Sequence, residues 1–146
     1  MIVLDTNVLS ELMRRQPSGT VIAWLDEQTE PLWTTSVTLH EICYGMERLK
    51  DERRRDSIRR TFAEAFAALI EPRVLVFDEP SARHAGVISA RRERAGMPIS
   101  LADCQIASIV HCNSAILATR DVRDFAHLDL RIVNPWQAEQ PGAAPG

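Results

Sequence analysis

The amino-acid sequence predicts an α/β fold in which helices cover a mainly parallel sheet of about five strands. Short apolar runs of β-forming residues alternate with longer segments of helical periodicity. This alternation is typical of parallel strands joined by helical crossovers. The chain has 146 residues, 45% of them hydrophobic and 25% charged, which is enough for one globular domain of ordinary composition.

The strands are expected where short apolar runs are bounded by polar or turn residues. The first run is apolar throughout and stops at Asp5, as expected of a strand that is buried on both faces. The other runs share its β-forming content. The five predicted strands are Ile2–Leu4, Leu32–Thr34, Arg73–Phe77, Ala115–Ala118 and Arg131–Val133.

Six helices are expected between these strands, and capping or breaking residues mark their ends. Ser100 fits the N-cap of the last helix, Pro72 follows the fourth, and Gly96 follows the fifth. In the third helix, Glu41 lies beside an apolar stripe, and Gly45, one turn later, leaves room for a close approach on the same face. The predicted helices are Asn7–Met13, Ser18–Gln28, Val37–Leu49, Glu52–Ile70, Glu79–Ala95 and Leu101–Cys112.

The chain is expected to form one domain over residues 1–136, followed by a flexible C-terminal tail over residues 137–146 that is rich in Pro, Gly and Ala. No N-terminal segment resembles a signal peptide, and no segment has the ~20 apolar residues of a membrane span. We therefore expect a cytoplasmic protein with no membrane partner. The three cysteines lack metal-binding or disulfide spacing and are expected to be small core residues.

The net charge of −3 argues against a protein whose whole surface attracts nucleic acid. Two segments are nevertheless basic, the stretch from Arg53 to Arg60 and the run from Arg91 to Arg94. Each can be a patch that contacts phosphates, or a solvated helix face on which opposite charges pair. The sequence leaves both interpretations open.

Four carboxylates lie near predicted strand ends or helix starts. Asp5 ends the first strand, Glu41 lies in the first turns of the third helix, and Asp121 follows the fourth strand. In a right-handed parallel sheet these positions share one edge, where the ligands of such sheets bind. Asp103 begins a helix that precedes its strand, so we expect this helix start at the opposite edge unless the helix crosses beneath the sheet.

Each acid alone also has a structural explanation. Asp5 can cap the short helix after it, and Asp121 can close a turn. The segments Thr38–Glu41 and Ser100–Asp103 both match the capping-box pattern. Four acids at one edge, however, would repel one another and raise one another's pKa unless a cation neutralises them. Carboxylates without neighbouring His or Cys favour Mg²⁺ or Mn²⁺ over Zn²⁺.

Other catalytic patterns are absent or incomplete. His40 and Glu41 begin like a zinc-protease helix, but Tyr44 occupies the position of the second histidine. The sequence contains no phosphate-binding glycine loop, dinucleotide-binding motif or nucleophile elbow. The acids are therefore the strongest indication of chemistry.

Taken in order along the chain, the acidic motifs resemble those of PIN-domain ribonucleases. More narrowly, they resemble the VapC and FitB-like toxins of type II toxin-antitoxin pairs. The resemblance extends from Met1 to about Trp136. It rests on the segments Met1–Glu11, Glu41 with Gly45, Phe77–Pro80, Ser100–Ala107, Ala118–Asp121 and Asn134–Trp136.

The resemblance implies a PIN-like three-layer α/β/α fold whose acidic pocket holds Mg²⁺ or Mn²⁺, and it implies that the helix start at Asp103 reaches this pocket. By position, Asp5 and Asp103 are the principal metal ligands. Glu41 and Asp121 complete the catalytic set, directly or through water. Arg120 is given no role. Groups that orient the carboxylates or water are Thr6, Asn7 and Thr119.

The resemblance further implies that RNA is hydrolysed by metal-activated water, without a covalent enzyme intermediate. The implied partners are RNA, a second copy of the chain in a homodimer, and a small DNA-binding antitoxin that blocks the acidic groove. An antitoxin arginine near Asp5 and Asp103 is expected to replace the cation. Two alternatives stay open: a PIN-fold binding module that acts mainly in an antitoxin-toxin repressor complex on DNA with little nuclease activity, and a DNA nuclease with the same chemistry.

Overall fold

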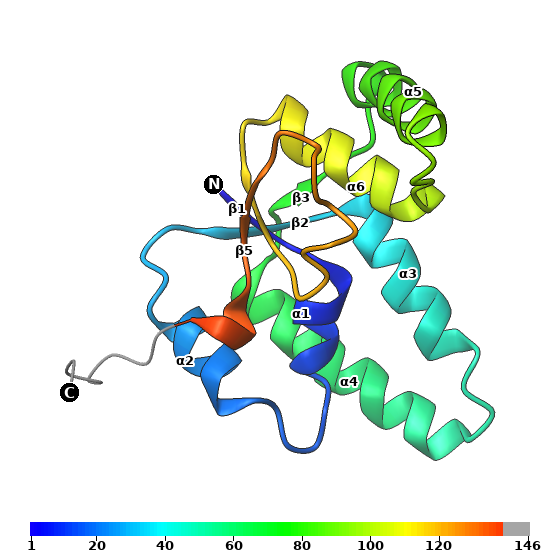
Figure 1. The fold of residues 1–146 in the computed structure, drawn as a ribbon. Helices are drawn as coiled ribbons and strands as arrows, with labels where there is room; N and C mark the ends of the chain where they lie inside the picture. Colours follow the sequence, from blue (N-terminus) through cyan, green and yellow to red (C-terminus); the bar gives the residue numbers. More distant parts are fainter. Residues whose placement is uncertain (139–146) are drawn as a thin grey trace.

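The computed structural model describes residues 1–138 of the chain (Figure 1). Its centre is a five-stranded sheet in which all neighbouring strands are parallel. The fold class and the number of strands predicted from the sequence are therefore confirmed. The strands lie in the order β3-β2-β1-β4-β5 and are β1 (Ile2–Leu4), β2 (Leu32–Thr35), β3 (Val74–Leu75), β4 (Ile116–Ala118) and β5 (Arg131–Val133).

The strand order reverses at the centre of the sheet, between β1 and β4. From β1 the chain builds outward through β2 to β3, and it then returns to the other side of β1 with β4 and β5. Val3 of β1 accordingly pairs with Trp33 on one side and with Leu117 on the other. Ligands of parallel sheets bind beyond the carboxyl ends of the strands at such a reversal. Here Asp5 follows β1 and Thr119 follows β4.

Helices cover both faces of the sheet and give the molecule three layers (Figure 1). Alternate residues of a strand point to opposite faces. Val3 therefore belongs to the core cluster beneath α5 and α6, whereas Leu4 belongs to the cluster beneath α1, α2 and α4. The helices are α1 (Thr6–Glu11), α2 (Gly19–Asp26), α3 (Ser36–Glu47), α4 (Glu52–Leu69), α5 (Glu79–Arg94) and α6 (Leu101–Cys112), and a short 3-10 helix η1 spans Pro135–Gln137.

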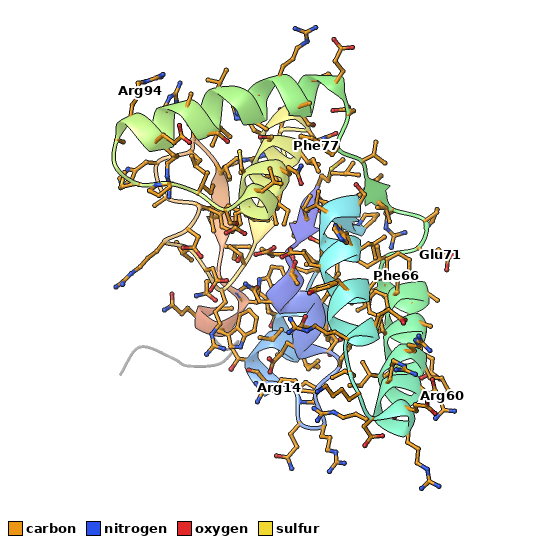
Figure 2. All side chains as sticks on the ribbon, turned by 90° about the vertical axis from the view of Figure 1, so that its right-hand side faces the viewer. Arg14, Arg60, Phe66, Glu71, Phe77 and Arg94 are labelled. Carbon is orange, nitrogen blue, oxygen red and sulfur yellow. The ribbon has the colours of Figure 1, made fainter. Side chains whose placement is uncertain are left out.

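Helix α4 packs by one side only, and none of its residues is fully removed from solvent. Phe62 and Phe66, whose ring centroids are 5.6 Å apart, contribute to its contact with the cluster beneath α1 and α2. Arg60 lies on the outer side of the helix, at the periphery of the molecule (Figure 2). Because the apolar side is narrow, most of the charged surface of α4 stays in water.

Hydroxyl groups cap the two helices that carry Asp103 and Glu41. Ser100 caps α6 as predicted, because its hydroxyl accepts from the N–H of Asp103 at 3.1 Å. The N-cap of α3 is Thr35, whose hydroxyl accepts from the N–H of Thr38 at 3.0 Å. A capping box that begins at Thr38 is therefore excluded, and the carboxylate of Glu41 is available for other contacts.

The expectation that α6 starts at the opposite edge of the sheet is wrong. Helix α6 ends at Cys112, and a tight turn that includes Ser114, with φ of 51°, leads directly into β4. A helix that runs back along the strand after it must begin beside the carboxyl end of that strand. Asp103, in the first turn of α6, therefore lies at the same edge as Asp5.

The predicted boundaries of all helices and strands lie within two residues of the observed ones. The largest relative change is in β3, which is shorter than the predicted run because the chain leaves the sheet at Val76, a side chain that is 61% exposed. One expectation about the cysteines is also corrected. Cys104 is buried as expected, but Cys43 and Cys112 are exposed.

The C-terminal end of the described chain packs against the domain. Gln137, which was expected to lie in the flexible tail, belongs to η1, and Ala138 packs with Trp136 against the cluster beneath α1 and α2. The rest of the expected tail, residues 139–146, lies outside the described residues. Across residues 1–138, the structure contains no helix with the length and apolar content needed to cross a membrane.

Candidate active site

Asp5 is the centre of the site and is only 4% exposed. Its Oδ1 accepts from the N–H of Thr6 at 2.8 Å, which caps α1. Its Oδ2 accepts from the hydroxyl of Thr119 at 2.7 Å. Capping therefore accounts for one oxygen of Asp5 only, and the other is held by a residue from across the sheet reversal.

Thr119 is fully buried and connects three parts of the site. While its hydroxyl donates to Asp5, it accepts from the side-chain amide of Asn7 at 3.2 Å and from the N–H of Asp121 at 3.1 Å. The amide of Asn7 also donates to Asp121 at 3.1 Å, and its oxygen accepts from the N–H of Arg120 at 3.2 Å. Thr119 and Asn7 thus hold two of the predicted acids in one hydrogen-bonded network.

Glu41 reaches the site from α3 and is half-buried. The hydroxyl of Thr6 donates to its Oε1 at 2.7 Å, so Thr6 binds Asp5 through its backbone and Glu41 through its side chain. Gly45 lies one turn further along α3, and nothing lies within 4 Å of the position that its Cβ would take. The surface beside Glu41 is therefore open, as the missing side chain indicates.

Asp103 reaches the site from the first turn of α6 and is half-buried. The charges of Glu41 and Asp121 both act on it, as does that of Asp124. Sequence reasoning did not find Asp124, which shares a turn with Asp121 through an N–H to carbonyl hydrogen bond of 3.1 Å. The three-residue spacing of these two acids after β4 was the available signal.

The pKa values of Asp5 and Asp103 are raised, and neighbouring carboxylates contribute to both increases. Burial raises the pKa of Asp5 from 3.8 to about 6, although hydrogen bonds from two threonines lower it. The charges of Asp103 and Glu41 raise it further. Burial also raises the pKa of Asp103, and three nearby carboxylates add to the rise. In residues 1–138, no Lys or Arg forms an ion pair with any of the four predicted acids, so the protein does not neutralise them itself.

The donor set fits a hard divalent cation. Carboxylate oxygens are the preferred protein ligands of Mg²⁺ and Mn²⁺, and a cation would favour the charged form of Asp5, whose pKa is raised by burial and by the charges of Asp103 and Glu41. In the described part of the chain, no group of three or more Asp, Glu, His or Cys side chains is arranged to hold a metal ion. Mg²⁺ does not require such a group, since it usually keeps several waters and takes one or two carboxylates.

The basic stretch on α4 contains arginines of two kinds. Arg55 and Arg59 form ion pairs with acids of α3 and α4. Arg53, Arg54 and Arg60 form none with any described residue. The solvated-face interpretation therefore holds for the paired arginines, and contact with phosphates stays a prediction for the other three.

The second basic run is partly structural. Arg92 is buried, and its guanidinium donates to the carbonyl of Met97 at 2.6 Å and to that of Ala126 at 2.9 Å. A guanidinium that is used in this way is not available to a phosphate. Arg91 and Arg94 stay exposed, so they alone remain candidates in this run.

The fold and the acidic site together define the class of protein. The chain belongs to the PIN domain family, which matches residues 2–130. The matched residues contain all four predicted acids and the three predicted supporting side chains. The family membership that the ordered motifs indicate is therefore confirmed.

Relatives within the family match this chain over most of their length. Plasmid stability protein StbB of Pseudomonas syringae pv. tomato is 35% identical over 94% of this chain and 100% of the relative. VapC ribonuclease Y4jK of Sinorhizobium fredii is 34% identical over 94% of this chain and 99% of the relative. The crystal structure of FitAcB from Neisseria gonorrhoeae is 34% identical, with a TM-score of 0.85 over 94% of this chain and 100% of that chain. A structure of FitAB bound to an IR36 DNA fragment has the same TM-score.

Proposed function

We propose that this chain is a metal-dependent endoribonuclease and the toxin of a type II toxin-antitoxin system, acting in the cytoplasm. The observation that carries the proposal is the meeting of Asp5, directly after β1, with Asp103 of α6: Asp5 is buried, Asp103 is half-buried, and both have raised pKa values. The relative named VapC ribonuclease supports RNA as the substrate class.

The acids are proposed to divide into two pairs. Asp5 and Asp103 are the principal metal ligands, because burial is greatest for Asp5, the charge of Asp103 raises the pKa of Asp5, and burial raises the pKa of Asp103. Glu41 and Asp121 complete the set, directly or through water. Bound Mg²⁺ or Mn²⁺ would supply a nucleophile at neutral pH and shield the charge of the reacting phosphate.

The supporting side chains keep the acids ionised and oriented. Hydrogen bonds from Thr119 and Thr6 favour the charged form of Asp5 and lower its pKa, against the effect of burial. Asn7 fixes Asp121, which otherwise stands on an exposed turn. These three groups therefore position the ligands and are not expected to touch the reacting atoms.

Cleavage of RNA by the purified protein tests the proposal. In the presence of Mg²⁺ or Mn²⁺ the parent should cut RNA, and Asp5→Asn or Asp103→Asn should lower the rate at least about 100-fold, because these changes remove metal ligands rather than their supports. Asp129→Asn is the matched control, since Asp129 is exposed and its φ of 53° suits asparagine. Equal cutting by parent and Asp5→Asn would mean a contaminating nuclease and would end the proposal.

The same preparations separate RNA cleavage from the two alternatives. A DNA nuclease would cut single-stranded DNA in place of RNA. A binding module that acts in a repressor complex, like the FitAB complex on DNA, would cut neither and would show no metal-dependent thermal shift. A shift with Mn²⁺ that Asp103→Asn abolishes favours the enzyme.

The proposed protein partners are a small DNA-binding antitoxin and a second copy of the chain. The antitoxin is proposed to place an arginine against Asp5 and Asp103, where a guanidinium replaces the cation. Co-expression with the antitoxin should relieve toxicity and inhibit RNA cleavage in vitro. Light scattering of the purified chain should give the mass of a dimer.

A further inference from the structure

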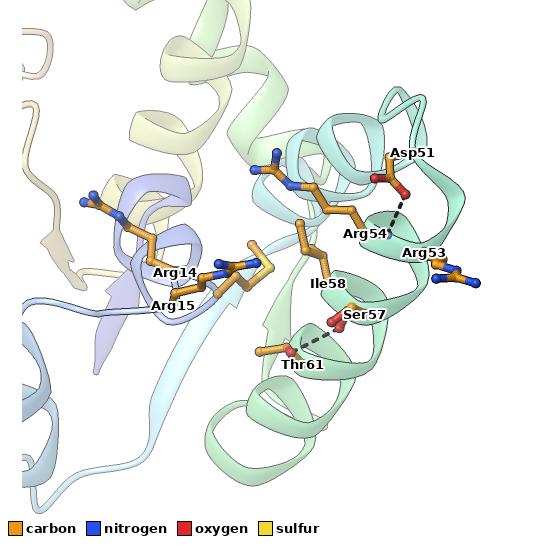
Figure 3. Close-up of a pocket in the computed structure, with 9 residues that line it drawn as sticks. Arg14, Arg15, Asp51, Arg53, Arg54, Ser57, Ile58 and Thr61 are labelled. Atoms are coloured by element: carbon orange, nitrogen blue, oxygen red, sulfur yellow. Dashed lines mark hydrogen bonds between the residues drawn. The ribbon is translucent and has the colours of Figure 1, made fainter.

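A cavity of about 780 Å³ lies between the end of α1 and the start of α4. Arg15 extends into it from the segment after α1, and Arg54 extends toward Arg15 from the first turn of α4, whereas Arg14 lines the cavity with its guanidinium pointing away from α4 (Figure 3). Arg53 lies at the rim and points away (Figure 3). The one acid in the lining, Asp51, caps α4 by accepting from the N–H of Arg54 at 3.1 Å. We call this space the arginine cavity.

The arginines of this cavity are poorly neutralised by the protein. Arg14 has one ion pair, with buried Glu11 at 3.3 Å, and its side chain remains 64% exposed. Arg15 and Arg54 form no ion pair with any described residue. Like charges from two separate elements therefore face one space in a chain whose net charge is −3. An anion in that space would relieve their repulsion.

A second hollow, which we call the groove, lies between the arginine cavity and the acidic site. The groove has a volume of about 310 Å³ and reaches Thr6 and Glu41, which share the hydrogen bond described above, and it also passes Gly45. The two spaces adjoin, because residues of α4 and of the segment after α1 line both of them, namely Met13, Arg14, Arg54 and Ile58. A single extended ligand can therefore contact the acids and the arginines together.

We propose that the arginine cavity binds the phosphates of an RNA strand at a distance from the bond that is cut at the acidic site. This rests on the proposed ribonuclease function. RNA carries one negative charge per nucleotide, so a strand at the acidic site has further phosphates along its length to place in the cavity. The planar guanidinium matches two phosphate oxygens at once.

The groove between the two ends supports a nucleic-acid strand. Met13 and Ile58 line it with apolar surface, and Gly45 leaves it unobstructed at the acidic end. Apolar surface between two charged ends suits a ribose or a base, and the guanidinium groups beyond it suit the next phosphates. Arg15 and Arg54 are thus substrate-binding residues that never reach the reacting atoms.

The test is the binding of RNA in EDTA, where nothing is cut. A fluorescently labelled, random-sequence single-stranded RNA dodecamer is titrated with the parent and with the double variant Arg15→Gln, Arg54→Gln at several salt concentrations. Loss of two phosphate contacts should weaken binding about tenfold at low salt and flatten the slope of log K against log salt by about 1.4, at ~0.7 per phosphate for single strands. The matched control is Arg60→Gln, an exposed and unpaired arginine of the same helix that does not line the cavity.

The arginine cavity proposal is supported if the double variant loses affinity and salt dependence while Arg60→Gln keeps both. It is overturned if the two variants bind the dodecamer with the same affinity. It is also overturned if the double variant binds RNA as the parent does and loses affinity only for polyglutamate. Both substituted side chains are exposed, so unchanged melting temperatures are expected and confirm folding. Binding is measured without cleavage, so a parent that binds RNA through the cavity but never cuts it would contradict only the proposed nuclease function.

Discussion

The acidic edge of the sheet and the basic surface of α4 differ in whether their charged side chains have partners of opposite charge. At the acidic edge, carboxylates from the end of β1, from α3, from α6 and from the turn after β4 meet because the topology brings these segments together. No described cation pairs with the four predicted acids. On α4, Arg55 and Arg59 find acids nearby on α3 or on their own helix. A cluster of like charges therefore indicates a ligand where the fold brings unpaired side chains together. It does not indicate one where nearby side chains of opposite charge already form ion pairs with the cluster.

The arginine cavity is intermediate between the acidic edge and the paired arginines of α4. Its side chains are exposed like the rest of α4, but they come from two elements and remain largely unpaired like the acids. Exposure lowers the cost of their repulsion, since water screens it. The cavity is thus expected to bind its ligand more weakly, and with more sensitivity to salt, than the acidic edge binds a cation.

The largest expected effect is on the pH dependence of stability in the metal-free protein. The pKa of Asp5 is about 6 when folded and 3.8 ordinarily, so the folded state binds the extra proton between these values and loses stability as pH rises through them. At ~1.36 kcal/mol per pH unit, the loss above about pH 6 is at most about 3 kcal/mol. Asp5→Asn cannot ionise and should escape it.

Urea unfolding in EDTA at several pH values measures this effect. The difference in free energy of unfolding between Asp5→Asn and the parent should shift in favour of the variant from about pH 4 to about pH 7. Saturating Mn²⁺ should remove most of this shift by stabilising the parent. A difference that does not change with pH would mean that the pKa of Asp5 is not raised in the folded protein. The acidic edge would then not differ from the paired charges of α4.

The next largest effect is expected for Thr119→Val, which keeps the shape of the side chain and removes its hydroxyl. Three partners lose their hydrogen bond to Thr119, so the free energy of unfolding should fall by about 2 kcal/mol and RNA cleavage at least about tenfold. Thr34→Val is the matched control, because Thr34 is equally buried but donates only to the carbonyl of Leu4. It should lower stability without lowering cleavage, and equal losses of activity in both would make Thr119 a merely structural residue.

The smallest effect is expected for Arg59→Gln. Its guanidinium pairs with Glu47 and Asp56, and this exposed pair raises the pKa of Arg59 and lowers that of Glu47. Exposed ion pairs contribute little, so the melting temperature and the affinity for the RNA dodecamer should both match the parent. A loss of RNA affinity as large as that of the arginine cavity variant would show that pairing does not decide which arginines bind.

The fold could be predicted from the sequence because its signals are local. Each strand is a short apolar run and each helix has its own periodicity and cap, so all boundaries came within two residues. Asp5 and Asp121 are recognisable because each lies within three residues of the end of a strand. The sequence assigns Asp103 to the site only through the family resemblance, because no local signal shows that α6 runs back along the strand that follows it.

The features that could not be predicted depend on contacts between distant segments. Buried Arg92 donates to the carbonyl of Ala126, which lies 34 residues away along the chain, so its surroundings cannot be read from the neighbouring sequence alone. The arginine cavity arises only where the end of α1 meets the start of α4, and neither segment alone distinguishes Arg54 from Arg59. No local pattern encodes which charged side chains the packing leaves without a partner.

Isothermal titration of Mn²⁺ into the metal-free protein at about pH 6 tests most directly whether the acidic edge is a cation site. Near this pH about half of Asp5 is protonated, so Mn²⁺ should bind and release protons, which titrations in two buffers of different ionisation enthalpy measure. Asp129→Asn should behave like the parent, and Asp5→Asn should lose both the binding and the proton release. Equal binding of Mn²⁺ by the parent and Asp5→Asn, or no binding by the parent, would contradict the assignment of Asp5 as a metal ligand.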